Sequence, residues 1–139
     1  GIPGCAGLML GDLDRSTDPV LFRPGGRPGT ANLKSTPAIQ AGVLRRADEG
    51  EAMAAFCAAP SIFAGLGVLD GRHATANPAF VKAIAAGGAI VHDNPVVVDG
   101  FITTSRGAGT SIDLGLEIVR QLRGEDAAEA ISRGIVRTH

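Results

Sequence analysis

Cys57 is the residue of this chain best suited to do chemistry, because of the elements predicted on either side of it. The run of residues 52–56 carries no charge, which is typical of a strand buried on both faces. Pro60 then stands where a proline presets the first turn of a helix, and residues 61–66 continue it. The sequence therefore predicts a sharp strand-to-helix turn with Cys57 at its apex, the geometry of a nucleophile elbow.

Small side chains surround this cysteine, as a tight turn requires: Ala55, Ala58 and Ala59. Backbone N–H groups at the start of the following helix would face the sulfur and favour its thiolate, which is the nucleophilic form. The predicted chemistry is the addition of a thiolate to an electrophile. The competing interpretation is a buried structural cysteine, which behaves as a small apolar residue.

Arg106 is a candidate for binding an anion. It precedes a predicted helix whose first N–H groups would hold a negative ligand together with Thr110 or Ser111. The alternative is a solvated arginine beside a helix cap. The three histidines, His73, His92 and His139, show no metal-ligand spacing, so neither a metal nor another cofactor is expected.

Composition narrows the class of protein. A chain of 139 residues is expected to form a single domain over residues 1–139 with one core. The net charge of −1 argues against a nucleic-acid partner, and no apolar run is long enough to span a membrane.

Cys5, near the terminus, is a poor disulfide partner for an elbow cysteine, and no signal peptide is visible. A reducing, cytoplasmic location is therefore expected.

The elements that must position Cys57 alternate between strands and helices. A helix is predicted over residues 35–47, with Pro37 in its first turn, and Asp99-Gly100 indicates a tight hairpin. Alternating strands and helices predict an α/β layered domain with its site at the carboxyl ends of the strands. The other expected elements are strands over 8–10, 19–23, 73–76, 95–98 and 101–104, and helices over 78–85, 112–122 and 125–133.

Four motifs, in this order and spacing, resemble the ThiJ/PfpI superfamily, and most of all the branch of the Parkinson's-disease-associated human protein and bacterial YajL. This resemblance implies a flavodoxin-like three-layer α/β/α sandwich with a mostly parallel sheet, usually assembled as a homodimer. The motifs are Pro24-Gly25-Gly26, Phe56-Cys57-Ala58-Ala59-Pro60, Val96-Val97-Val98-Asp99-Gly100 and Thr104-Ser105-Arg106-Gly107-Ala108-Gly109-Thr110.

The resemblance also implies the site. Cys57 would be the nucleophile or an oxidation-sensitive thiol, and the backbone N–H groups of Gly26 and Ala58 would bind an oxyanion. The implied activity is glyoxalase III- or deglycase-like, on small reactive carbonyls. The alternative is a redox-sensing or chaperone-like protein of oxidative stress, in which an oxidant modifies Cys57 and nothing turns over.

Three departures from the family pattern bear on this activity. The acidic residue that relatives place beside the cysteine would lie upstream of Gly1, so the chain is expected to be N-terminally incomplete and to lack the first strand–helix–strand unit. Asn77 stands where many relatives have histidine, and an amide is not a general base. Arg23 replaces an aliphatic residue at a buried strand end, where it either lies beside the site as a cation or disturbs the core. An inactive family fragment is therefore a third interpretation.

Two other motifs are incomplete in this chain. Residues 29–35 resemble a phosphate-binding loop, but Leu33 occupies a position that requires glycine. A glutamine amidotransferase would carry glycines at Ala55 and Ala59 and a late His-x-Glu, which residues 138–139 do not provide.

Overall fold

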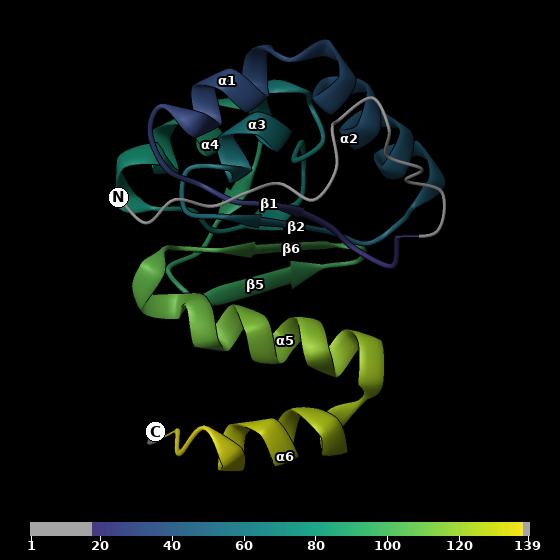
Figure 1. Cartoon of the computed structure of the whole chain (residues 1–139). Helices are drawn as coiled ribbons and strands as arrows, with labels where there is room; N and C mark the ends of the chain where they lie inside the picture. Colours follow the sequence, from purple (N-terminus) through teal and green to yellow (C-terminus); the bar gives the residue numbers. More distant parts are fainter. Residues whose placement is uncertain (1–17, 138–139) are drawn as a thin grey trace.

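A four-stranded sheet in the order β1-β2-β6-β5 lies at the centre of the fold (Figure 1). The computed structural model describes residues 18–137. Strands β1, β2 and β6 are parallel, whereas β5 is antiparallel to β6. The sheet is therefore mostly parallel, as expected. Its strands are β1 (Leu21–Arg23), β2 (Met53–Phe56), β5 (Val96–Asp99) and β6 (Ile102–Ser105).

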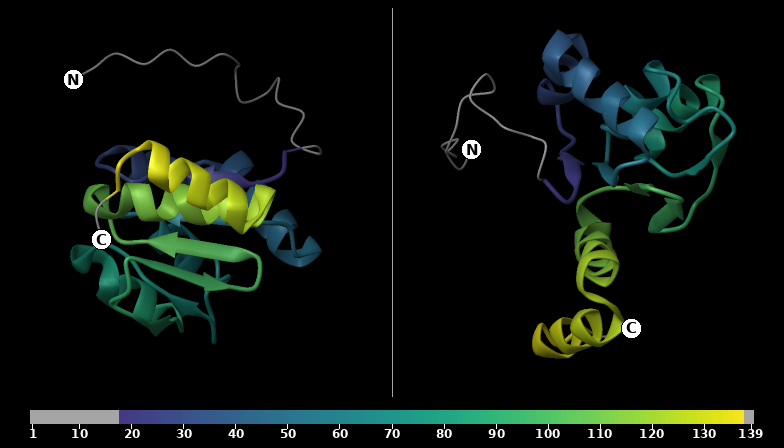
Figure 2. Two further views of the ribbon diagram at one scale, coloured as in Figure 1. Left: turned by 90° about the horizontal axis from the view of Figure 1, so that it is seen from below. Right: turned by 90° about the vertical axis from the view of Figure 1, so that its right-hand side faces the viewer.

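Helices cover both faces of this sheet, which gives three layers. Figures 1 and 2 show α1 to α4 on one side and α5 and α6 on the other. This is the flavodoxin-like α/β sandwich expected from the sequence. The helices are α1 (Gly29–Ser35), α2 (Pro37–Glu49), α3 (Pro60–Gly65), α4 (Val81–Ala86), α5 (Ser111–Arg123) and α6 (Glu125–Gly134). Two 3₁₀ turns, η2 (Pro78–Phe80) and η3 (Ala108–Thr110), precede α4 and α5.

Strand β2, which leads to the site, is deeply buried. Met53, Ala54 and Ala55 expose 1% or less of their surface, as a strand covered on both faces must. Its hydrogen-bonded neighbours are β1 and β6, with Met53 opposite both Leu21 and Ile102. The prediction of a buried strand leading to Cys57 is confirmed.

The core lies mainly between the sheet and the α1–α4 layer. Large apolar side chains of α2, α3 and α4 are fully enclosed there, among them Val43, Ile62, Phe63 and Ile84. This packing holds α3, the helix that follows Cys57, against the sheet.

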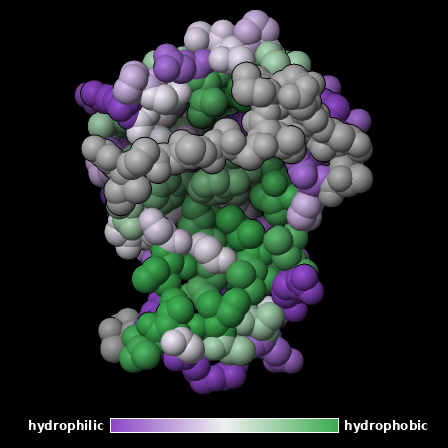
Figure 3. Space-filling model, viewed as in Figure 1, coloured by the Kyte–Doolittle hydropathy of each residue, from purple (hydrophilic) through white to green (hydrophobic). Residues whose placement is uncertain are grey.

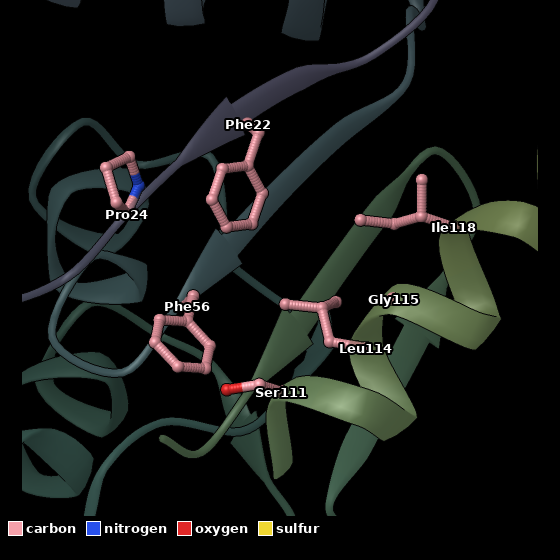
Figure 4. Close-up of a pocket in the computed structure, with 7 residues that line it drawn as sticks. All are labelled: Phe22, Pro24, Phe56, Ser111, Leu114, Gly115 and Ile118. Carbon is pink, nitrogen blue, oxygen red and sulfur yellow. The ribbon is translucent and has the colours of Figure 1, made fainter. Parts of the chain in front are cut away.

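The opposite face is only partly covered. An apolar groove of about 420 Å³ separates β1 and β2 from α5. Figure 4 shows the rings of Phe22 and Phe56 turned toward Leu114 and Ile118 of α5. Phe22 is 44% exposed. Figure 3 shows that apolar surface continues from this region over α5 and α6.

Several predicted boundaries were wrong. Residues 29–35, whose sequence resembles a phosphate-binding loop, form helix α1, and the helix predicted over 35–47 begins at Pro37 and ends at Glu49. Gly29 and Asn32 have low intrinsic helix propensity, which concealed α1, whereas tertiary packing against α2 and α3 stabilises it. The strand predicted over 73–76 pairs only at β3 (His73–Ala74), with the short β4 (Ile90–Val91) that no pattern indicated.

The hairpin prediction was correct except for a shift of one residue. Asp99 pairs with Ile102, so the two loop residues are Gly100 and Phe101. Gly100 has a φ of +60°, which glycine adopts at low cost at the first position of such a turn. The strand predicted over 8–10 lies outside the described residues. Within residues 18–137, no helix is both long and apolar enough to cross a membrane.

Candidate active site

Cys57 occupies the turn between β2 and α3 with a strained backbone. Its φ is +63°, in the left-handed region that residues other than glycine rarely adopt. Two hydrogen bonds hold this conformation: the Cys57 N–H donates to the Ser105 carbonyl, and the Cys57 carbonyl accepts from the Asn77 N–H, both at 2.9 Å. The cysteine is half-buried rather than sealed in the core. This is the sharp elbow predicted from the sequence.

The loop after β1 lies directly against this elbow at Gly25. A Cβ atom at this position would lie 2.6 Å from the Phe56 carbonyl oxygen and 2.7 Å from the Cys57 Cβ. Such distances are shorter than any van der Waals contact, so only glycine fits. The sequence showed a two-glycine turn, but only the tertiary contact explains Gly25, whereas Gly26 is explained by its φ of +103°.

The two backbone amides predicted to bind an oxyanion make no hydrogen bond within the described residues. Within the described part of the chain, neither the Gly26 nor the Ala58 N–H donates a hydrogen bond to a protein acceptor. The next amide along the turn, that of Ala59, donates to the Phe56 carbonyl at 3.0 Å and is therefore engaged. The oxyanion role of Gly26 and Ala58 stays a prediction.

Asn77 and Arg106, distant in sequence, line the same cavity. This cavity of about 310 Å³ also includes Pro78 and residues 107–110. The Asn77 Oδ1 accepts from the Ala79 N–H at 3.1 Å, which leaves its Nδ2 as the donor facing Gly107. Arg106 donates from Nη1 to the Asp93 carbonyl at 2.9 Å. The structure brings the two residues together, and anion binding by them stays a prediction.

A hydroxyl network that the sequence analysis missed shapes the loop after β6. The Ser105 Oγ donates to the Pro95 carbonyl at 2.9 Å and lies 2.7 Å from the Thr110 Oγ1. The Gly107 N–H donates to the same Thr110 oxygen at 3.1 Å. The residues of this network lie in the Thr-Ser-Arg-Gly-Ala-Gly-Thr motif, but the motif alone did not show which hydroxyls would contact each other. These hydrogen bonds fix the backbone around Ser105, whose carbonyl accepts the hydrogen bond from the Cys57 N–H.

Of the remaining candidates, His73, His92 and Arg23 lie within the described residues. His73 of β3 and His92, the residue after β4, face each other, with the His73 Nδ1 and the His92 Nε2 2.6 Å apart. No group of three potential metal-binding side chains is found within residues 18–137. Arg23 is partly buried at the end of β1, opposite Ala55 in register. Cys5 and His139 lie outside the described residues.

Comparison with known proteins places these features in a family. The DJ-1/PfpI family model matches residues 5–121. Protein DJ-1 homolog A of Arabidopsis thaliana is 35% identical over 133 residues, which cover 95% of this chain and 34% of that protein. The glutathione-independent glyoxalase DJR-1.2 of Caenorhabditis elegans is 28% identical, over 89% of this chain and 66% of that protein.

Solved structures agree with the sequence match. A cysteine-to-alanine mutant of a DJ-1 superfamily protein from Salmonella typhimurium superimposes with a TM-score of 0.90 and 28% identity, over 99% of this chain and 75% of that one. The chain spans about a third of the length of the Arabidopsis relative. The matched family model, together with the elbow and the sheet topology, shows that the chain belongs to the DJ-1/PfpI family.

Proposed function

We propose that this chain carries the cysteine site of a protein that converts small reactive carbonyls, with glyoxalase III- or deglycase-like activity. The observation that supports it most is the elbow itself: a half-buried Cys57 held at a φ of +63°, beside two amides that donate to no acceptor among the described residues. Backbone strain of this kind costs about 1–3 kcal/mol and is characteristic of functional sites. The glyoxalase names of two relatives support the same class of reaction.

The first step would be addition of the Cys57 thiolate to the aldehyde carbon of a dicarbonyl such as methylglyoxal. A C–S bond forms while the carbonyl π electrons move to oxygen, giving a hemithioacetal oxyanion. Gly26 and Ala58 would donate their amide hydrogens to this oxygen, where charge develops in the transition state. Transfer of a proton from the first carbon to the second then gives a thioester. Water hydrolyses the thioester to a 2-hydroxy acid and regenerates the thiol, so no external oxidant or reductant is consumed.

The proton transfer requires a base, and Asn77 does not supply one. Its Oδ1 already accepts from the Ala79 N–H, and an amide takes up no proton near neutral pH. Asn77 is suited instead to donate from Nδ2 to a bound oxygen in the cavity that it shares with Arg106. We therefore assign Asn77 and Arg106 to substrate binding and Cys57 to covalent chemistry.

Cys57→Ser tests this function against a matched control. The chain has two cysteines, so Cys5→Ser removes the same atom at the other position. We expect Cys57→Ser to abolish methylglyoxal consumption, measured by loss of the dicarbonyl and appearance of lactate, and Cys5→Ser to retain it. Turnover by Cys57→Ser at the unsubstituted rate contradicts the proposal.

We propose oxidation of Cys57 as a second function, supported by the absence of a base at Asn77. Oxidation to a sulfinate adds two oxygens to the sulfur and consumes two equivalents of peroxide, without a proton shuttle between carbon atoms. The amides of Gly26 and Ala58 would hold a sulfinate oxygen as they would an oxyanion. Titration with peroxide followed by peptide mass spectrometry should place two oxygens on Cys57 before any appear on Cys5. A Cys57 thiol that stays unmodified excludes this function.

A further inference from the structure

We infer that a second cavity, enclosed by α1, α3 and the η2–α4 segment, binds the carboxylate or phosphate group of a small organic anion. Its volume is about 460 Å³, within the range of small-molecule sites. This inference concerns a site separate from the cavity of Asn77 and Arg106 and does not depend on the chemistry of Cys57. Figure 1 shows α1 lying beside α3 in the helical layer that forms it.

Two cations line this cavity without a protein counter-charge. Arg27 and Lys34 form no ion pair within the described part of the chain, and none of the described residues that line the cavity is acidic. The Arg27 guanidinium is held 5.2 Å from the centre of the Phe80 ring. Lys34 reaches across to α3, where its Nζ lies 3.3 Å from the position of a Cβ on Gly65. Both positive groups therefore border the cavity, one near Phe80 and the other near Gly65, and attract an anion.

A buried hydroxyl in the wall of the cavity provides an independent observation. Thr30 is only 5% exposed, and its Oγ1 has no hydrogen-bond partner within residues 18–137. Leaving a buried hydroxyl unpaired is unfavourable, so its retention calls for an occupant that pairs with it. Thr30 and Lys34 are four residues apart and share one face of α1. Threonine in a helix populates two χ1 rotamers, and rotation between them would present the Thr30 hydroxyl to a ligand.

The other residues that line the cavity determine which uncharged part of a ligand would fit. Phe80 and Ala83 on one side and Pro28 and Ala31 on the other are apolar. The Ser61 hydroxyl already donates to the Ala58 carbonyl at 2.7 Å, so it offers only an acceptor lone pair. The cavity therefore suits an anionic group joined to a compact apolar or aromatic body, and inorganic phosphate fills only its charged end.

Binding of phenyl phosphate and benzoate, measured by calorimetry and by NMR shifts of the cavity amides, tests the inference. We expect at least one of them to bind, and the tighter one identifies the preferred anionic group. Inorganic phosphate should bind more weakly, and the neutral benzyl alcohol should not bind. The double variant Arg27→Gln/Lys34→Gln should weaken binding by about tenfold or more, because each charge-assisted contact is strong. Absence of binding by both aromatic anions, or equal binding of benzyl alcohol, overturns the inference.

Lys82→Gln is the matched control, because this exposed lysine of α4 does not line the cavity. It should leave affinity unchanged, and an equal loss in Lys82→Gln and the double variant would show nonspecific attraction and overturn the site. Cys57→Ser should bind the probes like the unsubstituted protein, so failure of this inference and failure of the proposed function are distinguishable.

Thr30→Val separates a ligand-binding hydroxyl from a structural one. The valine methyl removes an unpaired buried oxygen, so the melting temperature without ligand should rise while affinity for the aromatic anion falls. A lower melting temperature with unchanged affinity would show that the hydroxyl serves the fold instead, and would remove Thr30 from the site.

Discussion

The two faces of the central sheet differ in how completely they are packed. On one face, α2, α3 and α4 enclose side chains such as Phe63 and Ile84 without any exposed surface. On the other face, α5 leaves an apolar groove beside Phe22 and Phe56. Both faces meet at β2, the strand that carries Cys57 at its end.

This difference in packing indicates which contacts hold Cys57 in its strained conformation. A strained cysteine persists only when its surroundings over-determine its conformation. The closed face supplies this constraint, because it fixes α3 on one side of Cys57, and β6 receives the Cys57 N–H. On the open face, Phe56, the residue before Cys57, lines an apolar groove. We therefore expect substitutions on the closed face to be costly and substitutions in the groove to be tolerated.

Replacing a phenylalanine by alanine on each face of the sheet should give the largest expected effect on stability. Phe63→Ala should lower the free energy of unfolding by about 3–5 kcal/mol, because it leaves a cavity in a closed core. Phe22, 44% exposed, loses much less buried area, and Phe22→Ala should cost about 1 kcal/mol. Urea denaturation followed by circular dichroism measures both. Equal losses would mean that the groove is covered in solution, by another segment or a second copy, and would remove the contrast between the faces.

Substitution of Gly25 tests the contact between the β1 loop and the elbow. Gly25→Ala places a methyl group against the Phe56 carbonyl and Cys57, so either the loop or the elbow must shift. We expect a loss of about 1–3 kcal/mol in the free energy of unfolding and a changed rate of Cys57 alkylation by iodoacetamide.

Gly29→Ala is the matched control. A Cβ at Gly29 meets no atom within 4 Å, and the residue begins helix α1. Alanine should therefore be neutral or stabilising there, with an unchanged alkylation rate. Similar destabilisation by both alanines would show that the close approach at Gly25 does not exist in solution.

The smallest expected effect lies at the rim of the closed face, at the Arg45–Glu51 pair. Hydrogen bonds from Arg45 hold the pKa of the Glu51 carboxyl below its usual value of 4.5. A lowered pKa in the folded state means that Glu51 contributes stability above about pH 4.5, and that this contribution is lost as the pH falls through the lowered value. Glu51→Gln should therefore be slightly less stable than the unsubstituted protein at pH 7, with the gap closing in acid. A difference in the free energy of unfolding between the two proteins that grows as the pH falls would contradict the lowered pKa of Glu51.

Elements marked by strong local patterns were predictable from the sequence. The uncharged run before Cys57 and Pro60 after it identified β2 and the start of α3, and Asp99-Gly100 identified the hairpin to within one residue. Helix α1 was missed because residues such as Gly29 and Asn32 are weak helix formers. Its packing against α2 and α3 is a tertiary interaction, which local propensity does not reveal.

The sequence alone determined that Cys57 lies at a turn flanked by small residues, because this property depends on its immediate neighbours. The proposal that Cys57 is the chemical centre starts from the same residues. Only the tertiary structure decided that Gly25 must lack a side chain, that Asn77 and Arg106 line one cavity, and that Thr30 faces a second one with Arg27 and Lys34. These relations join elements far apart in the chain. They arise from how the sheet and its helices pack, which local periodicity does not encode.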